Sequence, residues 1–244
     1  MKKSVVFLLL MVCFTLQNMA QTYRNNFRTN EASIELEELA SPEVVFLFRK
    51  FQPAIIYYPT EKVEMNINYR LFQDEIISEA PGGETRALST RRLFDSIVVN
   101  DMLLIYDKNY GYVEKVRTQE KTFFIKYQSL YTMNEITQGA YGQASPAASA
   151  ESVNVLAGRE SGNLISDRVT LENTTGNEVQ VNIIFQPTMG LIEENQFEQI
   201  SSRRDLNKLF PDHRSAIRSF LRKEKISFDE RMDLIKLAKF LESL

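Results

Sequence analysis

The segment VEMNINYRL, residues 63–71, decides the class of fold. Its apolar residues stand at every second position, namely Val63, Met65, Ile67, Tyr69 and Leu71. This period of two is typical of a β-strand that turns one face to a hydrophobic core and the other to solvent. Each side chain that becomes buried in this way contributes about 1.5–3 kcal/mol to folding. The segment therefore predicts a half-buried strand of a sheet.

Segments with strand-like composition occur on both sides of this strand. EVQVNIIF (178–185) repeats the alternation. The other candidates, rich in β-branched and aromatic residues, are residues 32–39, 53–58, 96–106, 111–116 and 121–127. Turn-forming sequences separate these segments, and the connections are shorter than the crossovers that parallel strands need. We therefore expect an antiparallel β-meander, curled into a sandwich or an open barrel, as a β-rich body over residues 21–190.

The pattern changes after residue 197, where apolar residues recur at helical spacing. Asp212 is expected to cap a first helix that runs to about Lys223. The sequence SFDE (227–230) predicts a capping box at the start of a second helix, with Ser227 and Glu230 exchanging cap hydrogen bonds. The second helix should bury Leu234, Leu237, Ala238 and Leu241. Residues 198–244 are thus expected to form a helical hairpin, which makes the whole an α+β fold.

The first 20 residues have the features of a secretory signal peptide. Lys2 and Lys3 precede an apolar run from Val5 to Leu16, and Ala20 offers a small residue before a cleavage site. The run is shorter than the roughly 20 residues that a membrane-spanning helix needs. The single cysteine, Cys13, lies inside this run, so the mature chain is expected to have no disulfide, no thiolate and no transmembrane span.

The chain has a formal net charge of −3, and loss of the two lysines of the signal peptide makes it more negative. Such a chain has no overall positive field for nucleic acid, so a nucleic-acid partner is not expected. Exported chains of this size bury enough apolar surface to fold without disulfides. The composition therefore favours a periplasmic or extracellular protein that is associated with the cell envelope.

Several motifs together give the chain a resemblance to a known class of proteins. They are NYRLFQDEI (68–76), DKNYGYVEKV (107–116), GAYGQ (139–143) and the tail LFPDHRSAIRSFLRKEKISFDERMDLIKLAKFLESL (209–244). With these motifs the chain resembles uncharacterised secreted envelope proteins of Gram-negative bacteria, which have a β-rich body and a helical C-terminal tail. The resemblance implies a fold and a compartment; it implies no activity and no site residues.

The segment from about residue 137 to 166 is expected to be a flexible loop, because it is rich in small and polar residues. It lacks the spacing and the lysine of a phosphate-binding loop. A second interpretation is a lid or partner-binding loop, in which Tyr141 is the anchor and Arg159 the only cation. These two residues are candidate ligand- or partner-binding residues.

Basic residues concentrate in the first part of the tail. Arg214, Arg218 and Arg222 recur at every fourth position and form one stripe beside the apolar face of the predicted helix. Such a stripe is usually a solvated helix face or pairs with acidic residues, here those of ELEEL (35–39). The alternative is a binding surface for anionic lipid or an acidic partner. The three arginines are the other candidate binding residues.

No metal or cofactor site is predicted. DKNYG (107–111) begins like a calcium loop, but its glycine comes one position early, so a turn with Gly111 at positive φ is the better interpretation. The single histidine, His213, is expected near a helix start at the surface. Multi-histidine metal sites are excluded by this count.

The expected function is that of a secreted or periplasmic, non-enzymatic binding or scaffolding module, whose partner is an envelope protein or polymer. The alternative is a carboxylate-dependent hydrolase acting on an envelope or extracellular polymer. Its candidate carboxylates are Asp74, Glu75, Asp101 and Glu114, among which the spacing selects none.

Overall fold

A computed structural model of the chain describes residues 22–80, 82–88, 94–108, 110–116, 122–138, 144–146, 170–173, 177–193 and 196–244. The predicted signal peptide, residues 1–20, lies outside the described residues. The same holds for most of the loop expected at residues 137–166, including Tyr141 and Arg159.

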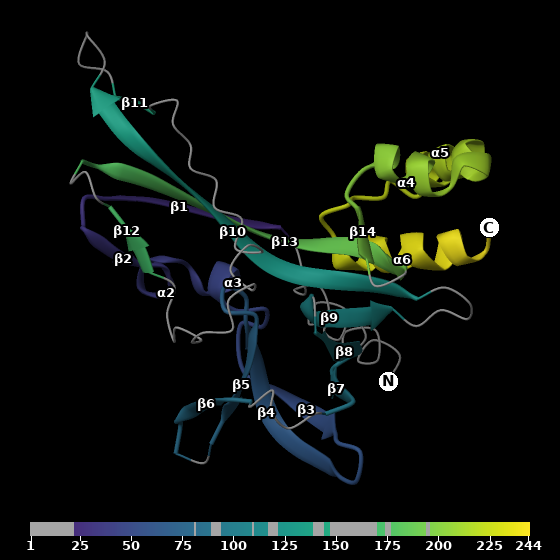
Figure 1. Cartoon of the computed structure of the whole chain (residues 1–244), viewed down its shortest axis with the longest axis horizontal. Helices are drawn as coiled ribbons and strands as arrows, with labels where there is room; N and C mark the ends of the chain where they lie inside the picture. The colour runs from purple at the N-terminus through teal and green to yellow at the C-terminus, as the bar shows by residue number, and fades with distance from the viewer. Residues whose placement is uncertain are drawn as a thin grey trace, which may run out of the picture.

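The described residues form an antiparallel β-sheet that is followed by helices at the C-terminus, which confirms the α+β class (Figure 1). From edge to edge the sheet contains β1 (Tyr23–Thr29), β13 (Val179–Glu193), β10 (Phe123–Gln138), β9 (Gly111–Val116), β8 (Met102–Asp107), β7 (Ser96–Val99), β3 (Gln52–Tyr57), β4 (Lys62–Arg70), β5 (Glu75–Glu79) and β6 (Thr85–Ala87). In addition, β11 (Ala144–Pro146) pairs with β10, and β14 (Gln196–Ile200) pairs with β13. A separate two-stranded sheet joins β2 (Ser33–Glu35) to β12 (Thr170–Glu172).

The sheet is assembled from two meanders. One contains β3 to β6 and the other β7 to β10, and within each of them strands that follow one another in the chain are paired. The meanders join where β7 pairs with β3, at Ile56↔Ile97 and its neighbours. The long strands β10 and β13 then continue the sheet to β1 at its edge (Figure 1).

Two sequence segments differ from the prediction. Residues 96–106 are two strands, because the chain turns at Asn100 and Asp101 between β7 and β8. Asn100 has a φ of 52°, in the left-handed region that asparagine tolerates better than most residues. Residues 32–39 form a strand only at Ser33–Glu35 and continue as the short helix α2 (Leu36–Leu39). The glycine turn before β9 is as predicted, with Gly111 at a φ of 71°.

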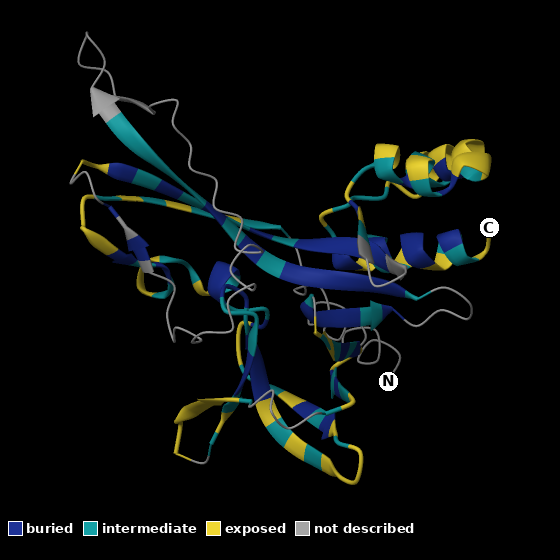
Figure 2. Cartoon of the chain, viewed as in Figure 1, coloured by how far each residue is buried: buried dark blue, intermediate teal, exposed yellow. Residues whose placement is uncertain are grey.

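The alternation in the sequence corresponds to one buried face of the sheet (Figure 2). In β13 the residues Val179, Val181, Ile183 and Phe185 are buried, as predicted. In β4 the alternation holds less completely, because Ile67 and Tyr69 are buried whereas Val63 and Met65 are only half-buried. The first part of β4, residues 62–66, thus extends beyond the core.

Besides α2, the helices are α3 (Pro42–Val45), which lies between α2 and β3 in the chain, and α4 (Arg203–Leu209), α5 (Arg214–Lys223) and α6 (Arg231–Glu242) at the C-terminus. A 3₁₀ turn, Pro211–His213, precedes α5, so Asp212 is not the cap that the sequence predicts. In α6, Leu234, Leu237, Ala238 and Leu241 are all buried, as predicted. The rings of Phe220 and Phe240 stack with their centroids 4.0 Å apart and join α5 to α6.

The capping box predicted at Ser227 and Glu230 is wrong. Helix α6 begins one residue after Glu230, which makes no side-chain cap bond. The hydroxyl of Ser227 instead accepts a hydrogen bond from the amide of Asp229. The reciprocal arrangement occurs at α4, where Ser202 Oγ accepts from the amide of Asp205, and Asp205 Oδ2 accepts from the amide of Ser201. Burial alone would raise the pKa of Asp205, but hydrogen bonds from Ser202 and Ser201 hold it below its ordinary value.

Replacing Ser202 by alanine is therefore expected to lower the free energy of unfolding by about 1 kcal/mol, because an amide at the start of α4 loses its acceptor. The matched substitution Ser227→Ala should cost less, since Ser227 caps no helix. Urea unfolding of the two variants measures the difference. A larger loss for Ser227→Ala would contradict this assignment of the caps.

Candidate functional site

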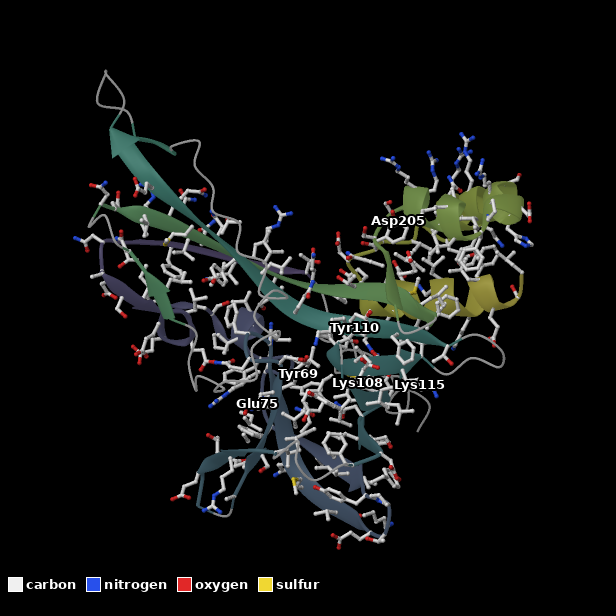
Figure 3. The ribbon with its side chains drawn as sticks, in the orientation of Figure 1. Tyr69, Glu75, Lys108, Tyr110, Lys115 and Asp205 are labelled. Carbon is white, nitrogen blue, oxygen red and sulfur yellow. The ribbon has the colours of Figure 1, made fainter. Side chains whose placement is uncertain are left out.

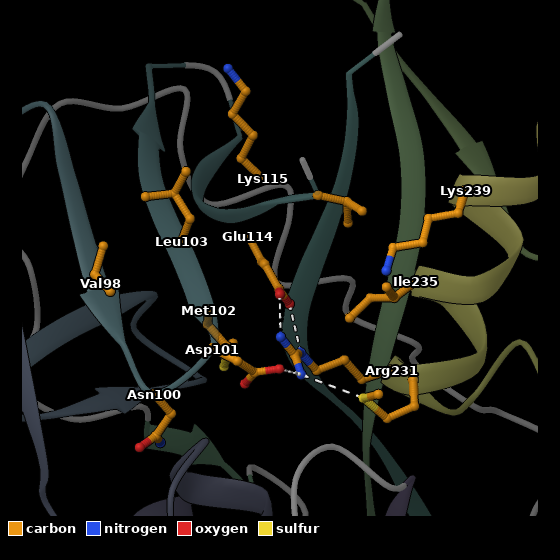
Figure 4. A pocket seen from close by; sticks show the side chains of 12 residues that line it. Val98, Asn100, Asp101, Met102, Leu103, Glu114, Lys115, Arg231, Ile235 and Lys239 are labelled. Carbon is orange, nitrogen blue, oxygen red and sulfur yellow. Dashed lines mark hydrogen bonds and ion pairs between the residues drawn. The ribbon is translucent and has the colours of Figure 1, made fainter. Parts of the chain in front are cut away.

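Arg231, the first residue of α6, is buried and joins the helix to the sheet (Figure 4). Its Nε and Nη2 donate to the two carboxylate oxygens of Glu114 in β9, at 2.9 and 2.5 Å. Its Nη1 donates to Asp101 Oδ2, in the turn between β7 and β8, at 2.9 Å. A cation at a helix N-terminus is opposed by the helix dipole, so these two carboxylates compensate a charge that the helix itself disfavours.

Tyr127 of β10 completes this buried cluster by donating its hydroxyl proton to Glu114. Burial raises the pKa of Tyr127 well above its ordinary value, and the negative charge of Glu114 raises it further. Burial alone would lower the pKa of Arg231, but its hydrogen bond to Glu114 raises that pKa above the ordinary value. The cluster therefore contains a protonated tyrosine and a charged guanidinium around one carboxylate.

A second polar cluster connects β10 to the turn between β4 and β5. Lys126 Nζ donates to Asp74 Oδ1 at 2.6 Å and to the carbonyl oxygen of Tyr112 at 3.2 Å. Tyr69 donates its hydroxyl to Asp74, and the amide of Tyr112 lies 3.3 Å from the same oxygen. Asp74 has a φ of 53°, which is uncommon outside glycine. The hydrogen bonds from Lys126 of β10 and Tyr112 of β9 to Asp74 hold the turn between β4 and β5 against the sheet.

The four carboxylates of the predicted hydrolase alternative all contact cations. Asp74 pairs with Lys126, and Glu75 pairs with Arg70 at 3.5 Å. Asp101 and Glu114 are brought together, but by the same guanidinium, that of Arg231. A glycosidase pair needs one carboxyl group that keeps a proton for the leaving group. Two carboxylates arranged around one guanidinium suit a structural ion cluster better.

A cleft of about 450 Å³ lies beside this cluster, between α6 and the strands β7 to β9 (Figure 4). Its lining residues are Val98, Asn100, Asp101, Met102, Leu103, Glu114, Lys115, Val116, Arg231, Met232, Ile235 and Lys239. Lys115 and Lys239 have no ion-pair partner among the residues that the structure describes. The cleft thus combines apolar walls with two uncompensated cations.

The basic stripe predicted from the sequence lies on the exposed side of α5 (Figure 2). Arg214, Arg218 and Arg222 are exposed, as are Arg203 and Arg204 of α4, and Figure 3 shows nitrogen-tipped side chains extending outward from α4 and α5. We call these five arginines the basic face. In the described part of the chain none of the five has an ion-pair partner. Arg214 Nε donates to the carbonyl oxygen of Asn207.

Sequence reasoning found the basic stripe and named carboxylates of the buried clusters, but it missed the two cations that hold these clusters together. Lys126 follows an apolar strand segment, and Arg231 follows a run of acidic residues, so both resemble ordinary surface charges in the sequence. His213 directly precedes α5, as predicted, but it is half-buried and not fully exposed. Across the described ranges, no group of three or more His, Cys, Asp or Glu residues could hold a metal ion.

Comparison with known proteins adds no relative. The chain matches no family model, and no curated protein or solved structure is significantly similar to it. None of the helices in the described segments is both long and apolar enough to cross a membrane. The function is therefore inferred from the surfaces and clusters of this chain alone.

Proposed function

We propose that this protein is a non-enzymatic binding and scaffolding module of the cell envelope, exported to the periplasm or the outer surface, and that its basic face binds an anionic envelope polymer. The observation that carries the proposal is the set of five exposed arginines on α4 and α5, none of them ion-paired within the described residues. The proposal of export depends on the signal-like segment at residues 1–20.

Charge distribution supports this assignment. The whole chain is acidic, with a net charge of −3, yet residues 201–225 carry eight lysines and arginines against three acids. Cations gathered on one face of an acidic protein attract a polyanion to that face and leave the rest of the surface repulsive. Arginine suits a phosphate or carboxylate partner, because its planar guanidinium can donate two parallel hydrogen bonds.

The way in which the tail is held supports a scaffolding role. Helix α6 is fixed to the sheet by the Arg231–Glu114 pair, and α5 stacks on α6 through Phe220 and Phe240. A binding face on such a support is already ordered before the partner arrives, so less entropy is lost on binding. We also propose that the sheet curls into a sandwich or an open barrel and that α5 and α6 form a helical hairpin.

The double substitution Arg218→Glu/Arg222→Glu tests the proposal. Each basic residue near an anionic surface contributes about 1 kcal/mol, so this variant should bind polyphosphate at least about tenfold more weakly at 50 mM salt. The matched control is Arg24→Glu/Arg28→Glu, which reverses two exposed arginines on β1. Titration calorimetry with polyphosphate, and with uncharged dextran as a blank, measures the affinities.

Two results would contradict the proposal. One is an equal loss of affinity in the β1 control, which would mean that binding follows net charge and not the basic face. The other is polyphosphate binding of the unmodified protein that is no tighter at 50 mM than at 200 mM salt, because a polyanion complex weakens as salt is added.

A further inference from the structure

A second cleft continues the one beside α6. It has a volume of about 570 Å³ and is lined by Pro53, Ala54, Ile55, Glu64, Met65, Asn66, Val98 and Asn100. Val98 and Asn100 line both clefts. The two clefts together thus follow a groove that crosses β4, β3, β7 and β8 and ends at α6.

The floor of the groove is apolar. Ile55 pairs with Val98, and Val98 pairs with Leu103, so these three side chains form one row across the sheet. They are only half-buried, whereas their neighbours in β7, Ile97 and Val99, are fully buried on the core side. At the α6 end, Ile235 lines the groove, and Met232 is one of the most exposed large apolar residues, at 54%. Half-exposed apolar side chains in a row favour an apolar ligand.

The two ends of the groove differ in charge. Lys115 and Lys239 line the end at α6, and Figure 4 shows Lys239 on the helix and Lys115 on β9, its side chain directed away from Glu114. Arg231 at the same end is already compensated by Glu114 and Asp101. Glu64 lines the opposite end, on β4. A ligand with an anionic group at one end and an apolar body would therefore place its anion at the α6 end.

The backbone under the groove argues against a peptide ligand. The groove crosses β3, β7 and β8, each of which is paired with a neighbour on both sides, so their amides and carbonyls are used within the sheet. A peptide laid across them would lose water from its backbone without gaining hydrogen bonds in exchange. A hydrocarbon chain has no such groups to satisfy. The geometry therefore favours a hydrocarbon over a polypeptide.

We propose that this groove binds a single-chain anionic amphiphile of the long-chain fatty acid class. The carboxylate lies at the end of the groove that Lys115 and Lys239 line, and the alkyl chain follows Leu103, Val98 and Ile55. The three strand spacings from β8 to β4 cover about 14 Å, which accommodates most of an extended acyl chain. Each cleft has the size of an ordinary small-molecule site. This site is separate from the basic face on α4 and α5.

Palmitate, titrated below its aggregation concentration into the full mature chain, tests the proposal. We expect saturable binding, weakened at least about tenfold by Lys115→Glu/Lys239→Glu and by Val98→Asp. The side chain of Val98 is half-exposed, so this aspartate should be tolerated in the fold; Leu103→Gln repeats the test at a second position if Val98→Asp unfolds. The variant Arg218→Glu/Arg222→Glu should bind palmitate normally, which separates this site from the proposed polymer-binding face.

A cationic amphiphile of the same chain length distinguishes charge recognition from simple hydrophobic adsorption. Cetyltrimethylammonium should bind at least about tenfold more weakly than palmitate. Equal binding of the two amphiphiles, absence of palmitate binding, or unchanged binding in the Lys115→Glu/Lys239→Glu variant would each overturn the proposal. Tighter binding of an apolar peptide than of palmitate would assign the groove to a polypeptide and overturn it as well.

Discussion

Replacing Arg231 by methionine is expected to lower the free energy of unfolding by about 3–5 kcal/mol, because the buried carboxylate of Glu114 loses the guanidinium that compensates it. Glu114 and Arg231 have side-chain exposures of 4% and 3%, so water cannot replace the lost partner. Urea unfolding followed by far-ultraviolet circular dichroism measures the change. The same substitution at exposed Arg222 should change stability by less than about 0.5 kcal/mol.

A double variant separates the lost ion pair from lost packing. Arg231→Met/Glu114→Gln removes both charges and leaves an acceptor for the hydroxyl of Tyr127. It should be more stable than Arg231→Met alone, because no uncompensated charge remains buried. If the double variant is as unstable as the single one, the side-chain packing of Arg231, and not its charge, holds α6 in place.

Replacing Lys126 by methionine should cost about 3 kcal/mol, because Asp74 would remain nearly buried without its ammonium partner. Tyr69 and the amide of Tyr112 still donate to Asp74, so the loss is smaller than at Arg231. Chemical denaturation at neutral pH measures it. The matched control is Lys62→Met on the exposed end of β4, where little change is expected. Equal stability of the two variants would show that the Lys126–Asp74 pair contributes nothing.

Local patterns in the sequence predicted local structure well. The alternation in residues 63–71 and 178–185 identified β4 and β13, because the period of a strand depends only on neighbouring residues. The four buried positions of α6 followed from helical spacing for the same reason. The turn between β7 and β8 was not predicted, because only two residues separate the apolar residues of the two strands. The asparagine at that point is the signal that could have revealed it.

Helix starts were predicted less well, because several residues compete for each cap. Ser202 and Ser227 each stand three residues before an acid, and only the first of them caps a helix. The hydroxyl of Ser227 instead accepts a hydrogen bond from the amide of Asp229, two residues along the chain. A short motif therefore shows that a helix begins nearby, but the choice among candidate caps depends on the tertiary position of the chain.

The buried clusters could not be predicted at all. Arg231 and Glu114 are 117 positions apart, and Lys126 and Asp74 are 52 apart. With 32 acidic and 29 basic residues, the chain offers many pairings, and nothing local to any one residue selects among them. The order of the strands decides which charges meet, and that order depends on the joining of β7 to β3.

The edge strand β1 has a consequence for how the chain folds. Tyr23 and Thr29 pair with Phe185 and Val179, so among the described strands the first one has its sheet neighbour at least 150 residues further along the chain. Bringing together two segments so far apart in the chain lowers the entropy before any stabilising contact has formed. Folds rich in contacts between distant residues therefore form slowly. During synthesis, β1 must wait until most of the chain has been made. Under the export proposed above, β1 would still lack its strand partner while it passes through a translocation channel.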